Sequence, residues 1–434
     1  MTTASVRLLG RRRFVGMSAA LSAAMAISFP RFDGVTLAQS AEQTLRLACE
    51  EPETFDTATL GGGIGIQWAN LLFEGLTRYD WENEQVVPGQ AKSWDISEDN
   101  LTYTFLLNDG LLWSDGSPLT AHDFEYTIKR NLDPALAGPL ATFFYPLQGA
   151  EDYFNAKTTD PNTIAVTAKD DLTLEMTLNA VTPYWLTMLS LWTMVPINKK
   201  SIDAGGAKWT EPETIISNGR YKMESWDHSQ SMVLVQNENF HGDKPQVTRI
   251  EYTIFENPPD QALTAFETGG VDLAQVTVSN FDFVNGDPDL SQLLYHQDVS
   301  GTWELRLDMS NASSAIADVN VRKALYLAID RDVLTKSILK GYMTPAYVLL
   351  PPDIPSYNPD VRLQGTVDDA KKYLADAGFP DGNGFPGLQL GFTARQENAQ
   401  LVSEAIVQMW KDNLGITAEA FAVPGPSHRK CLES

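Results

Sequence analysis

The sequence predicts an α/β protein that is divided into more than one domain. Strand-like segments, short and either alternating or apolar, recur along the chain with turn residues at their borders. They occupy residues 44–48, 101–107, 173–178, 231–237, 249–255 and 303–309. Helical patterns stand between some of them, and 43% of the 434 residues are hydrophobic, so the chain can bury a large core. Strands and helices interleave irregularly, which favours several α/β domains.

Three segments carry the apolar spacing of an amphipathic helix. Residues 120–132 open on Thr120 with Asp123 three positions later, which is the arrangement of a capping box. Residues 320–339 and 399–415 show the same apolar spacing, and the second of them ends on a glycine, a common helix terminator. We therefore expect helices over these three ranges.

Two proline-rich stretches predict loops. One surrounds Pro258–Pro259, and the other runs from Leu350 to Pro359. Proline lacks a backbone N–H and restricts the residue before it, so regular structure is often interrupted there. Both stretches are therefore candidate connectors or lid loops.

The first 40 residues predict an export signal of the twin-arginine type. Arginines at 11, 12 and 13 precede an apolar, alanine-rich stretch from Phe14 to Phe29. That stretch is too short to cross a bilayer stably, which takes about 20 residues. Small residues mark a cleavage site near Ala38 or after Ser40, so we expect a mature chain that begins around Ala41.

Charge and cysteine content exclude several classes of protein. The formal net charge is −24, and an acidic surface repels nucleic acid phosphates and anionic lipid. We therefore expect no nucleic acid partner and, since no apolar stretch of spanning length follows the signal, no direct membrane insertion. The only two cysteines, Cys49 and Cys431, lie far apart in the sequence, so a disulfide framework does not hold this fold together.

The residues that enzymes need are not grouped in the sequence. Five histidines are scattered without a metal-ligand spacing, and no nucleophile motif or phosphate-binding loop occurs, which predicts no catalytic site, no metal and no cofactor. The run GGGIG at 61–65 lacks the glycine spacing of a dinucleotide fingerprint. Glycines without a Cβ instead let the backbone approach a ligand and offer it free N–H and C=O groups.

Residues 91–124 closely resemble the signature region of the family 5 extracellular solute-binding proteins, the oligopeptide, dipeptide and nickel binders. Asp109-Gly110, Trp113-Ser114-Asp115-Gly116 and Thr120-Ala121-x-Asp123 fall in the family's order, although Leu107 stands where the family usually has a basic residue. Similar stretches occur at residues 55–59, 71–76, 217–226, 266–275 and 318–332. The resemblance spans about residues 44–421.

This resemblance implies a type II periplasmic-binding-protein-like fold, with two lobes and an extra inserted domain. The implied domains are a first lobe over 41–75 and 196–303, an inserted domain over 76–195, and a second lobe over 304–434. Residues 130–139, 208–223 and 341–352 look most like the oligopeptide-binding branch, which implies a peptide ligand. In that branch the peptide lies between the lobes as an extended strand and is held by main chain from both.

Candidate ligand-binding residues follow from the resemblance and from the glycine run. The first-lobe main-chain rail is assigned to Gly62, Gly63, Ile64 and Gly65. Lesser candidates are Asn218 and Gly219, which form a turn dipeptide, and Trp303, which begins a predicted strand. A purely structural role is an equally good interpretation for each of these three.

The C-terminal end departs from the family. Members continue beyond the helix end at Leu414-Gly415-Ile416 into a Trp-x-x-Asp-Tyr-like motif, which supplies the second rail and an aspartate for the peptide's amino terminus. No such motif occurs here, and the composition of residues 423–434 breaks with what precedes it. We therefore expect a truncated or frame-altered product with an incomplete second lobe.

The resemblance implies the binding component of an ABC importer. Such a protein captures peptides in the periplasm as a monomer and delivers them to permease subunits that work with cytoplasmic ATPases. One alternative is a member of the same family that binds another solute, such as a nickel chelate, an oligosaccharide or an opine-like compound. A more distant alternative is a secreted hydrolase, although the sequence offers no nucleophile and base for it.

Overall fold

A computed structural model describes most of the chain. The described residues are 2–9, 43–60, 65–256, 258–354, 356–393 and 398–423. Among these residues, no helix combines the length and the apolar character that a bilayer crossing requires. The arginines at 11–13, the apolar stretch after them, the cleavage site and residues 424–434 of the tail lie outside the described residues.

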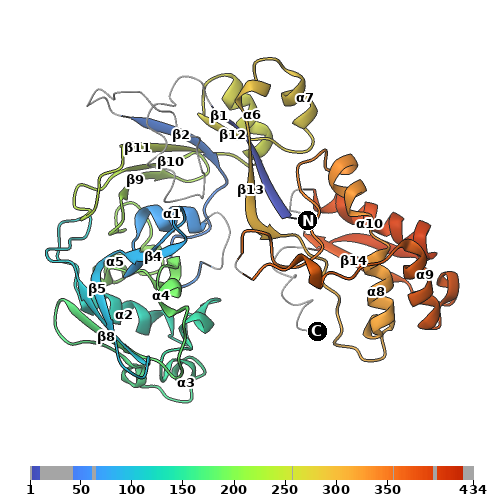
Figure 1. The fold of residues 1–434 in the computed structure, drawn as a ribbon. Coiled ribbons are helices and arrows are strands. Elements are labelled where there is room, and N and C mark those ends of the chain that lie inside the picture. The colour runs from blue at the N-terminus through green and yellow to red at the C-terminus, as the bar shows by residue number, and fades with distance from the viewer. Residues whose placement is uncertain are drawn as a thin grey trace. The chain divides into compact units, whose positions relative to one another are not determined.

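The chain forms two compact units (Figure 1). The larger unit holds residues 10–273, and the smaller unit holds residues 1–9 and 274–434. The predicted inserted domain, 76–195, falls wholly within the larger unit together with most of the predicted first lobe. The division between the units lies within β12 (Leu273–Gln275). The lobe boundary after residue 303 stays a prediction.

A four-stranded sheet forms the first part of the larger unit, in the order β2-β11-β10-β9. Strand β2 runs parallel to β11, and the other neighbours are antiparallel. The alternation in β2 buries Leu45, Leu47 and Cys49 on one face, as a strand with one covered face requires. The bounds are β2 Thr44–Cys49, β9 Tyr221–Asp227, β10 Ser231–Gln236 and β11 Arg249–Ile254.

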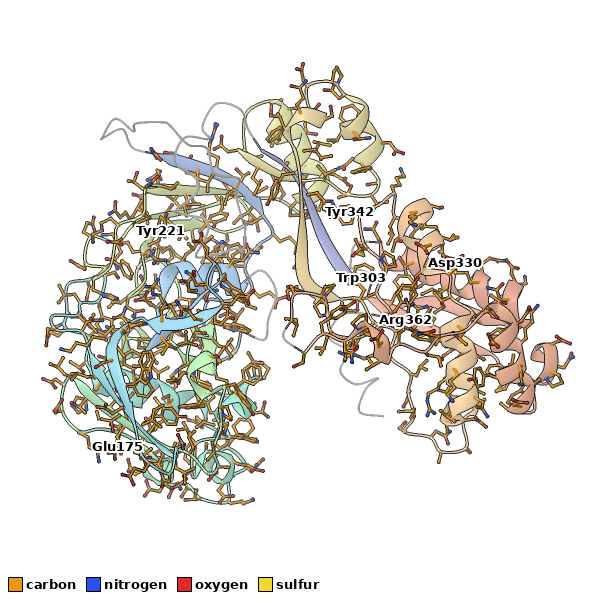
Figure 2. All side chains as sticks on the ribbon, in the orientation of Figure 1. Glu175, Tyr221, Trp303, Asp330, Tyr342 and Arg362 are labelled. Carbon is orange, nitrogen blue, oxygen red and sulfur yellow. The ribbon has the colours of Figure 1, made fainter. Side chains whose placement is uncertain are left out.

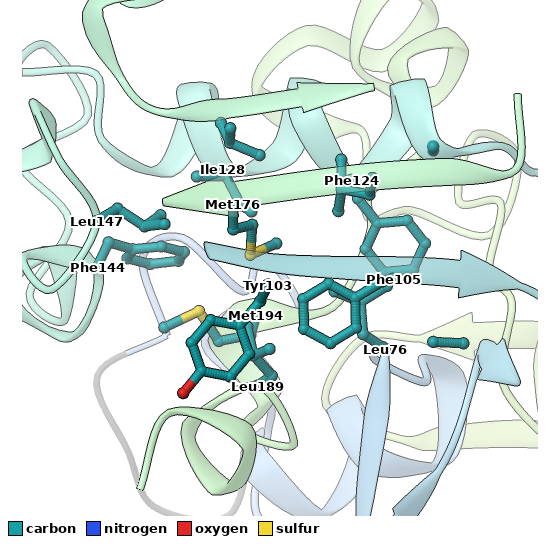
Figure 3. Packing of buried hydrophobic residues seen from close by; sticks show 14 of the residues in the cluster. Leu76, Tyr103, Phe105, Phe124, Ile128, Phe144, Leu147, Met176, Leu189 and Met194 are labelled. Atoms are coloured by element: carbon teal, nitrogen blue, oxygen red, sulfur yellow. The ribbon is translucent and has the colours of Figure 1, made fainter. Parts of the chain in front are cut away.

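A second sheet with its own core lies within residues 76–195. Its order is β5-β6-β8-β7, and the hairpin β3-β4 precedes it in the sequence. Phe105 from this sheet and Phe124 from α2 (Ala121–Asn131) are almost fully buried in one apolar cluster (Figure 3). The strands are β3 Thr77–Asp80, β4 Gln85–Pro88, β5 Ala91–Ile96, β6 Thr102–Leu107, β7 Val166–Ala168 and β8 Thr173–Thr177.

Helix α2 (Ala121–Asn131) begins at the predicted capping box. The Thr120 N–H donates to Asp123 Oδ2 over 2.8 Å, which satisfies a backbone donor at the helix start. The predicted helix over 120–132 is therefore confirmed. The other α-helices among the described residues of this unit are α1 Gly65–Leu72, α3 Ala150–Phe154, α4 Trp185–Met188, α5 Lys199–Gly205 and α6 Pro258–Glu267.

The smaller unit contains a three-stranded sheet, β12-β1-β13, in which β1 is Thr2–Leu9, and a parallel pair, β14-β15. Helix α10 (Ala399–Leu414) ends at Gly415, whose φ of 69° is the left-handed conformation that favours glycine at a helix end. The predicted helix over 399–415 is therefore confirmed. The remaining elements are α7 Phe281–Gly286, β13 Leu294–Thr302, α8 Val319–Leu327, α9 Val367–Asp376, β14 Leu388–Thr393 and β15 Ala418–Val423.

Strand β1 (Thr2–Leu9) comes from the region that the sequence predicts to be removed at export. It pairs antiparallel with β13, from Leu8 opposite Leu294 to Thr2 opposite Thr302. Because β1 is the only strand bonded to β13 among the described residues, β13 depends on this N-terminal segment for its backbone partners.

Three local predictions are corrected by the structure. Residues 303–309 are not a strand, because no neighbouring strand pairs with them among the described residues and alternation alone does not form a ladder. Pro258 and Pro259 open α6 rather than a loop, since proline is tolerated in the first helical turn. The helix predicted over 320–339 is interrupted, with α8 followed by a π-helical turn at Val333–Ile338.

Candidate functional site

Of the four residues predicted to form the first-lobe rail, one is described. Gly62, Gly63 and Ile64 lie outside the described residues, and Gly65 is the first residue of α1. A Cβ at Gly65 would lie 2.4 Å from Leu60 Cδ1, so a larger residue would displace that side chain. Close packing against Leu60 therefore explains a glycine at this position. The rail itself stays a prediction.

Asn218 is buried, and its side-chain amide forms hydrogen bonds with the main chain of Glu74. Its Nδ2 donates to the Glu74 carbonyl over 2.9 Å, and its Oδ1 accepts from the Glu74 N–H over 3.2 Å. Its backbone N–H donates to the Leu72 carbonyl over 3.2 Å. These contacts hold the chain where it leaves α1, so the structure gives Asn218 a positioning role.

Gly219 completes this support. Its N–H donates to the Leu72 carbonyl over 2.8 Å. A Cβ at this position would lie 2.5 Å from the Leu71 carbonyl oxygen and 2.7 Å from the Phe73 nitrogen, both backbone atoms. Only glycine allows so close an approach of two backbone segments. Asn218 and Gly219 thus fix the C-terminal end of the helix that begins at Gly65.

Trp303 belongs to the smaller unit. It is half-buried and follows β13 directly (Figure 2). The other described candidates, Gly65, Asn218 and Gly219, all belong to the larger unit, where Gly65 begins α1 and the other two contact its C-terminal end. A direct contact of any of these residues with a ligand stays a prediction.

Glu74 is a buried carboxylate that no pattern singled out. Its Oε2 accepts from Gln90 Nε2 over 2.9 Å and lies 2.6 Å from His241 Nε2. Arg78 Nε lies 3.2 Å from Oε1. The carboxylate therefore ties residues around the β3-β4 hairpin to the turn after β10. An acidic residue inside the apolar run LLFEGL was the available signal.

A cavity of about 520 Å³ opens in the larger unit. This volume falls in the range of sites for small molecules, about 300–1,000 Å³. The walls come from the loop after β2, from α2 and the loop after it, and from α5 and the turn that follows. The lining residues are Thr54, Asp56, Thr59, Tyr126, Arg130, Asp133, Leu136, Ile202, Gly206, Ala207, Trp209 and Thr210.

One wall of the cavity is built around Asp56. Arg130 donates to both of its carboxylate oxygens, over 2.9 and 2.5 Å, and Trp209 Nε1 donates to Oδ2 over 3.1 Å. Burial by itself raises the pKa of Asp56. The hydrogen bonds and the positive charge of Arg130 lower it, and so do the hydrogen bonds from Trp209 and the Ala58 N–H; together they outweigh the effect of burial. The pKa of Asp56 therefore lies below its usual value.

The sequence contained these three residues without indicating that they meet. Asp56, Arg130 and Trp209 lie inside the stretches 55–59, 130–139 and 208–223 that carry the resemblance. Their convergence depends on contacts between residues up to 153 positions apart. In the part of the chain that the structure describes, no group of three or more His, Cys, Asp or Glu side chains could hold a metal ion.

Comparison with known proteins gives the wider context. Residues 85–429 match the family described as bacterial extracellular solute-binding proteins, family 5 middle. The chain is 31% identical to the oligopeptide-binding protein OppA of Bacillus subtilis, over 83% of this chain and 66% of that protein. It is 30% identical to the periplasmic oligopeptide-binding protein OppA of Haemophilus influenzae, over 84% of this chain and 68% of that protein. The chain thus spans about two thirds of the length of these relatives.

Solved structures agree in fold. A periplasmic oligopeptide-binding protein from Borrelia burgdorferi matches with a TM-score of 0.74 and 29% identity, over 89% of this chain and 77% of that one. The Escherichia coli murein tripeptide-binding protein MppA matches with a TM-score of 0.72 and 26% identity, over 90% of this chain and 77% of that one. The predicted fold class, the two-lobe α/β fold of periplasmic binding proteins, is therefore confirmed. The family match covers most of the chain, and the chain belongs to the family 5 bacterial extracellular solute-binding proteins.

Proposed function

We propose that this chain is the substrate-binding component of an ABC importer, which captures peptides and delivers them to membrane permease subunits. The observation that carries the proposal is its 31% identity to an oligopeptide-binding protein across most of its length. Structural neighbours include Haemophilus influenzae OppA in complex with the peptide RPPGFSPFR and Listeria monocytogenes OppA bound to peptide. An oligopeptide is therefore the favoured ligand.

In the proposed binding mode, the protein forms hydrogen bonds with the backbone of the peptide. Main chain from residues 62–65 would pair with an extended peptide, while α1, anchored by Asn218 and Gly219, would set where that segment ends. Trp303 would add an aromatic face to the peptide contact. Backbone pairing of this kind tolerates many peptide side chains, because amide groups are common to all of them.

The proposed site of action is outside the cytoplasm. The family is extracellular, and the arginines at 11–13 followed by an apolar stretch support export by the twin-arginine route into the periplasm. There the mature chain would act as a monomer beside permease subunits that are driven by cytoplasmic ATPases. The full chain carries a net charge of −24, and an acidic surface of this kind supports high solubility after export.

A second candidate function is capture of a different solute by the same fold. The probable deoxycholate-binding periplasmic protein YgiS of Escherichia coli is 30% identical over 76% of this chain. One relative is therefore named for binding an amphipathic steroid rather than a peptide. Peptide capture remains favoured, because several relatives and neighbours carry peptide-binding names.

Calorimetry with matched ligands tests the proposal. The purified chain is titrated with an alanine-rich pentapeptide, with the same peptide methylated on alternate backbone nitrogens, and with deoxycholate. We expect the plain peptide to bind and the N-methylated peptide to bind at least about tenfold more weakly, because each lost backbone hydrogen bond to a buried partner costs about 1–3 kcal/mol. Binding of deoxycholate without any peptide binding would favour the second candidate.

A variant pair tests the aromatic contribution. Trp303→Ala should weaken peptide binding at least about tenfold, since tryptophans in binding interfaces commonly contribute about 2 kcal/mol or more. Trp81→Ala is the matched control, because Trp81 is 59% exposed in the turn between β3 and β4. Equal peptide affinities in the two variants would remove Trp303 from the proposed site.

A further inference from the structure

The described lining residues of the cavity in the larger unit do not include Gly65, the one described residue of the predicted rail. Helix α2 supplies Tyr126 and Arg130, and the turn after α5 supplies Gly206, Ala207 and Trp209. Asn218, Gly219 and Trp303 are not among the cavity's described lining residues either. Its volume of about 520 Å³ is ample for a small molecule.

The Asp56–Arg130 ion pair lines the cavity, but its two opposite charges are already paired with each other. Both oxygens of Asp56 are occupied by Arg130, and Trp209 and the Ala58 N–H add two more donors. The two charges compensate each other, and each side chain is about one-eighth exposed. A ligand in the cavity would therefore meet this pair as a neutral surface.

Asp133 is the lining charge that stays uncompensated. Its Oδ1 accepts the Ala135 N–H over 2.9 Å, and no basic side chain forms an ion pair with it among the described residues. The carboxylate is half-buried, so it is reachable from the cavity and less screened than a fully exposed acid. Such a group attracts a cation.

Two hydroxyl groups also line the cavity without a hydrogen bond inside the described structure. Tyr126 is half-buried and Thr210 is buried, and neither hydroxyl has a protein partner there. Polar groups that face a cavity are usually satisfied by water or by a ligand. Both hydroxyls can donate or accept, so they suit a ligand that carries more than one polar group.

The aromatic residues of the cavity already attract cations. Arg130 Cζ lies 5.9 Å from the centre of the Trp209 ring, and Lys199 Nζ lies 5.9 Å from the centre of the Tyr126 ring. Lys199 is in turn paired with Asp203 over 2.6 Å. Aromatic faces and carboxylates together form the usual surroundings of a protein-bound organic cation.

We propose that this cavity binds a small organic cation, with an ammonium or guanidinium group on the Asp133 carboxylate. The hydroxyls of Tyr126 and Thr210 take the ligand's remaining polar group. Leu136 and Ile202 cover its carbon chain. The site goes beyond peptide capture and does not depend on it. Such a cationic group is present both in a free amine and in a lysine or arginine side chain of a peptide.

Calorimetry with agmatine and with 1,5-diaminopentane tests the site. We expect both to bind, whereas 1-pentanol and glutarate, which lack a cationic group, should not. Asp133→Asn keeps an oxygen for the Ala135 N–H but removes the charge, so it should weaken binding of both probes at least tenfold. Asp95→Asn is the control of equal charge change, because Asp95 is exposed on β5 and does not line the cavity.

A steric variant tests the cavity independently of charge. Ala207 is exposed at the lining, so Ala207→Phe should block the probes while leaving the circular dichroism spectrum and the unfolding midpoint unchanged. If neither probe binds, if Asp133→Asn binds them as tightly as the unaltered chain, or if 1-pentanol binds equally well, the proposal is overturned.

A peptide pair identifies the source of the cation. Ala-Lys-Ala is compared with Ala-norleucine-Ala in the unaltered chain and in Asp133→Asn. If the lysine peptide alone loses affinity in Asp133→Asn, the cavity receives a peptide side chain. If both peptides are unaffected and the free amines are weakened, the cavity holds a free amine. Loss of all peptide binding with retained amine binding would contradict only the proposed transport function.

Discussion

Arg130 donates two hydrogen bonds to Asp56, over 2.9 and 2.5 Å, and so joins α2 to the loop after β2. The two residues lie 74 positions apart, and each side chain is about one-eighth exposed. Trp209 adds a third element to the same carboxylate over 3.1 Å. The pair therefore connects the predicted first lobe to the predicted inserted domain within the larger unit.

Breaking this ion pair from one side should destabilise the larger unit. Arg130→Ala leaves the Asp56 carboxylate buried without its main partner, and such changes cost about 3 kcal/mol or more. Guanidinium chloride unfolding followed by tryptophan fluorescence measures the loss. Lys92→Ala removes the exposed pair with Asp109 and should change the free energy of unfolding by about 0.5 kcal/mol or less. Equal effects of the two variants would contradict the structural role of the Arg130 pair.

The same carboxylate predicts a dependence of stability on pH. The pKa of Asp56 is lower in the folded chain than its usual value of about 3.9, so the ionised form stabilises the fold above that value. This contribution is lost as the pH falls below about 4 and through the lower, folded-state pKa. We expect Asp56→Asn to be less stable than the unaltered chain at pH 7 and the difference to shrink towards pH 2. Asp95→Asn should follow the unaltered chain at every pH, and a constant difference for Asp56→Asn would contradict the assignment.

Gly219 should not tolerate a side chain. In Gly219→Ala the added Cβ meets backbone atoms of Leu71 and Phe73 at 2.5 and 2.7 Å, which forces two segments apart. Overpacking of this kind costs about 1–3 kcal/mol. Thermal unfolding compares this variant with Gly286→Ala, where a Cβ would meet nothing within 4 Å. A lower midpoint for Gly219→Ala alone is expected.

Cys49 should be unreactive while the protein is folded. Burial, aided by the charges of Glu51 and Glu50, raises the pKa of its thiol to about 12, so little reactive thiolate exists at neutral pH. In a Cys431→Ser background, we expect labelling by a maleimide to be slow in buffer and complete within minutes in denaturant. Fast labelling under native conditions would show that the β2 face of the sheet opens readily.

Strand β13 should become more open when the N-terminal segment is absent. Its only strand partner among the described residues is β1, which lies within the predicted export signal. Hydrogen exchange of amides 294–302 should therefore be faster in residues 41–434 than in the full chain. Amides of β10, in the sheet of the larger unit, should exchange equally in both. Equal exchange of β13 in the two chains would mean that β1 does not protect it.

Much of the local structure could be predicted because neighbours in sequence encode it. The capping box at Thr120 specifies where α2 begins, and alternation in residues 44–48 specifies the buried face of β2. The same alternation in residues 303–309 forms no strand, because a strand also needs a partner in space. Pro258 opens a helix, because the first helical turn needs no N–H from it.

The sequence by itself determined the fold class, the family, and the strands and helices whose periodic patterns are local. Only the tertiary structure decided that Asp56, Arg130 and Trp209 meet beside a cavity, and that Asn218 binds the main chain of Glu74, 144 residues away. The physical reason is that hydrogen bonds and burial depend on distances in space. A chain can bring any two distant segments together, and periodicity records only which face of each segment is covered.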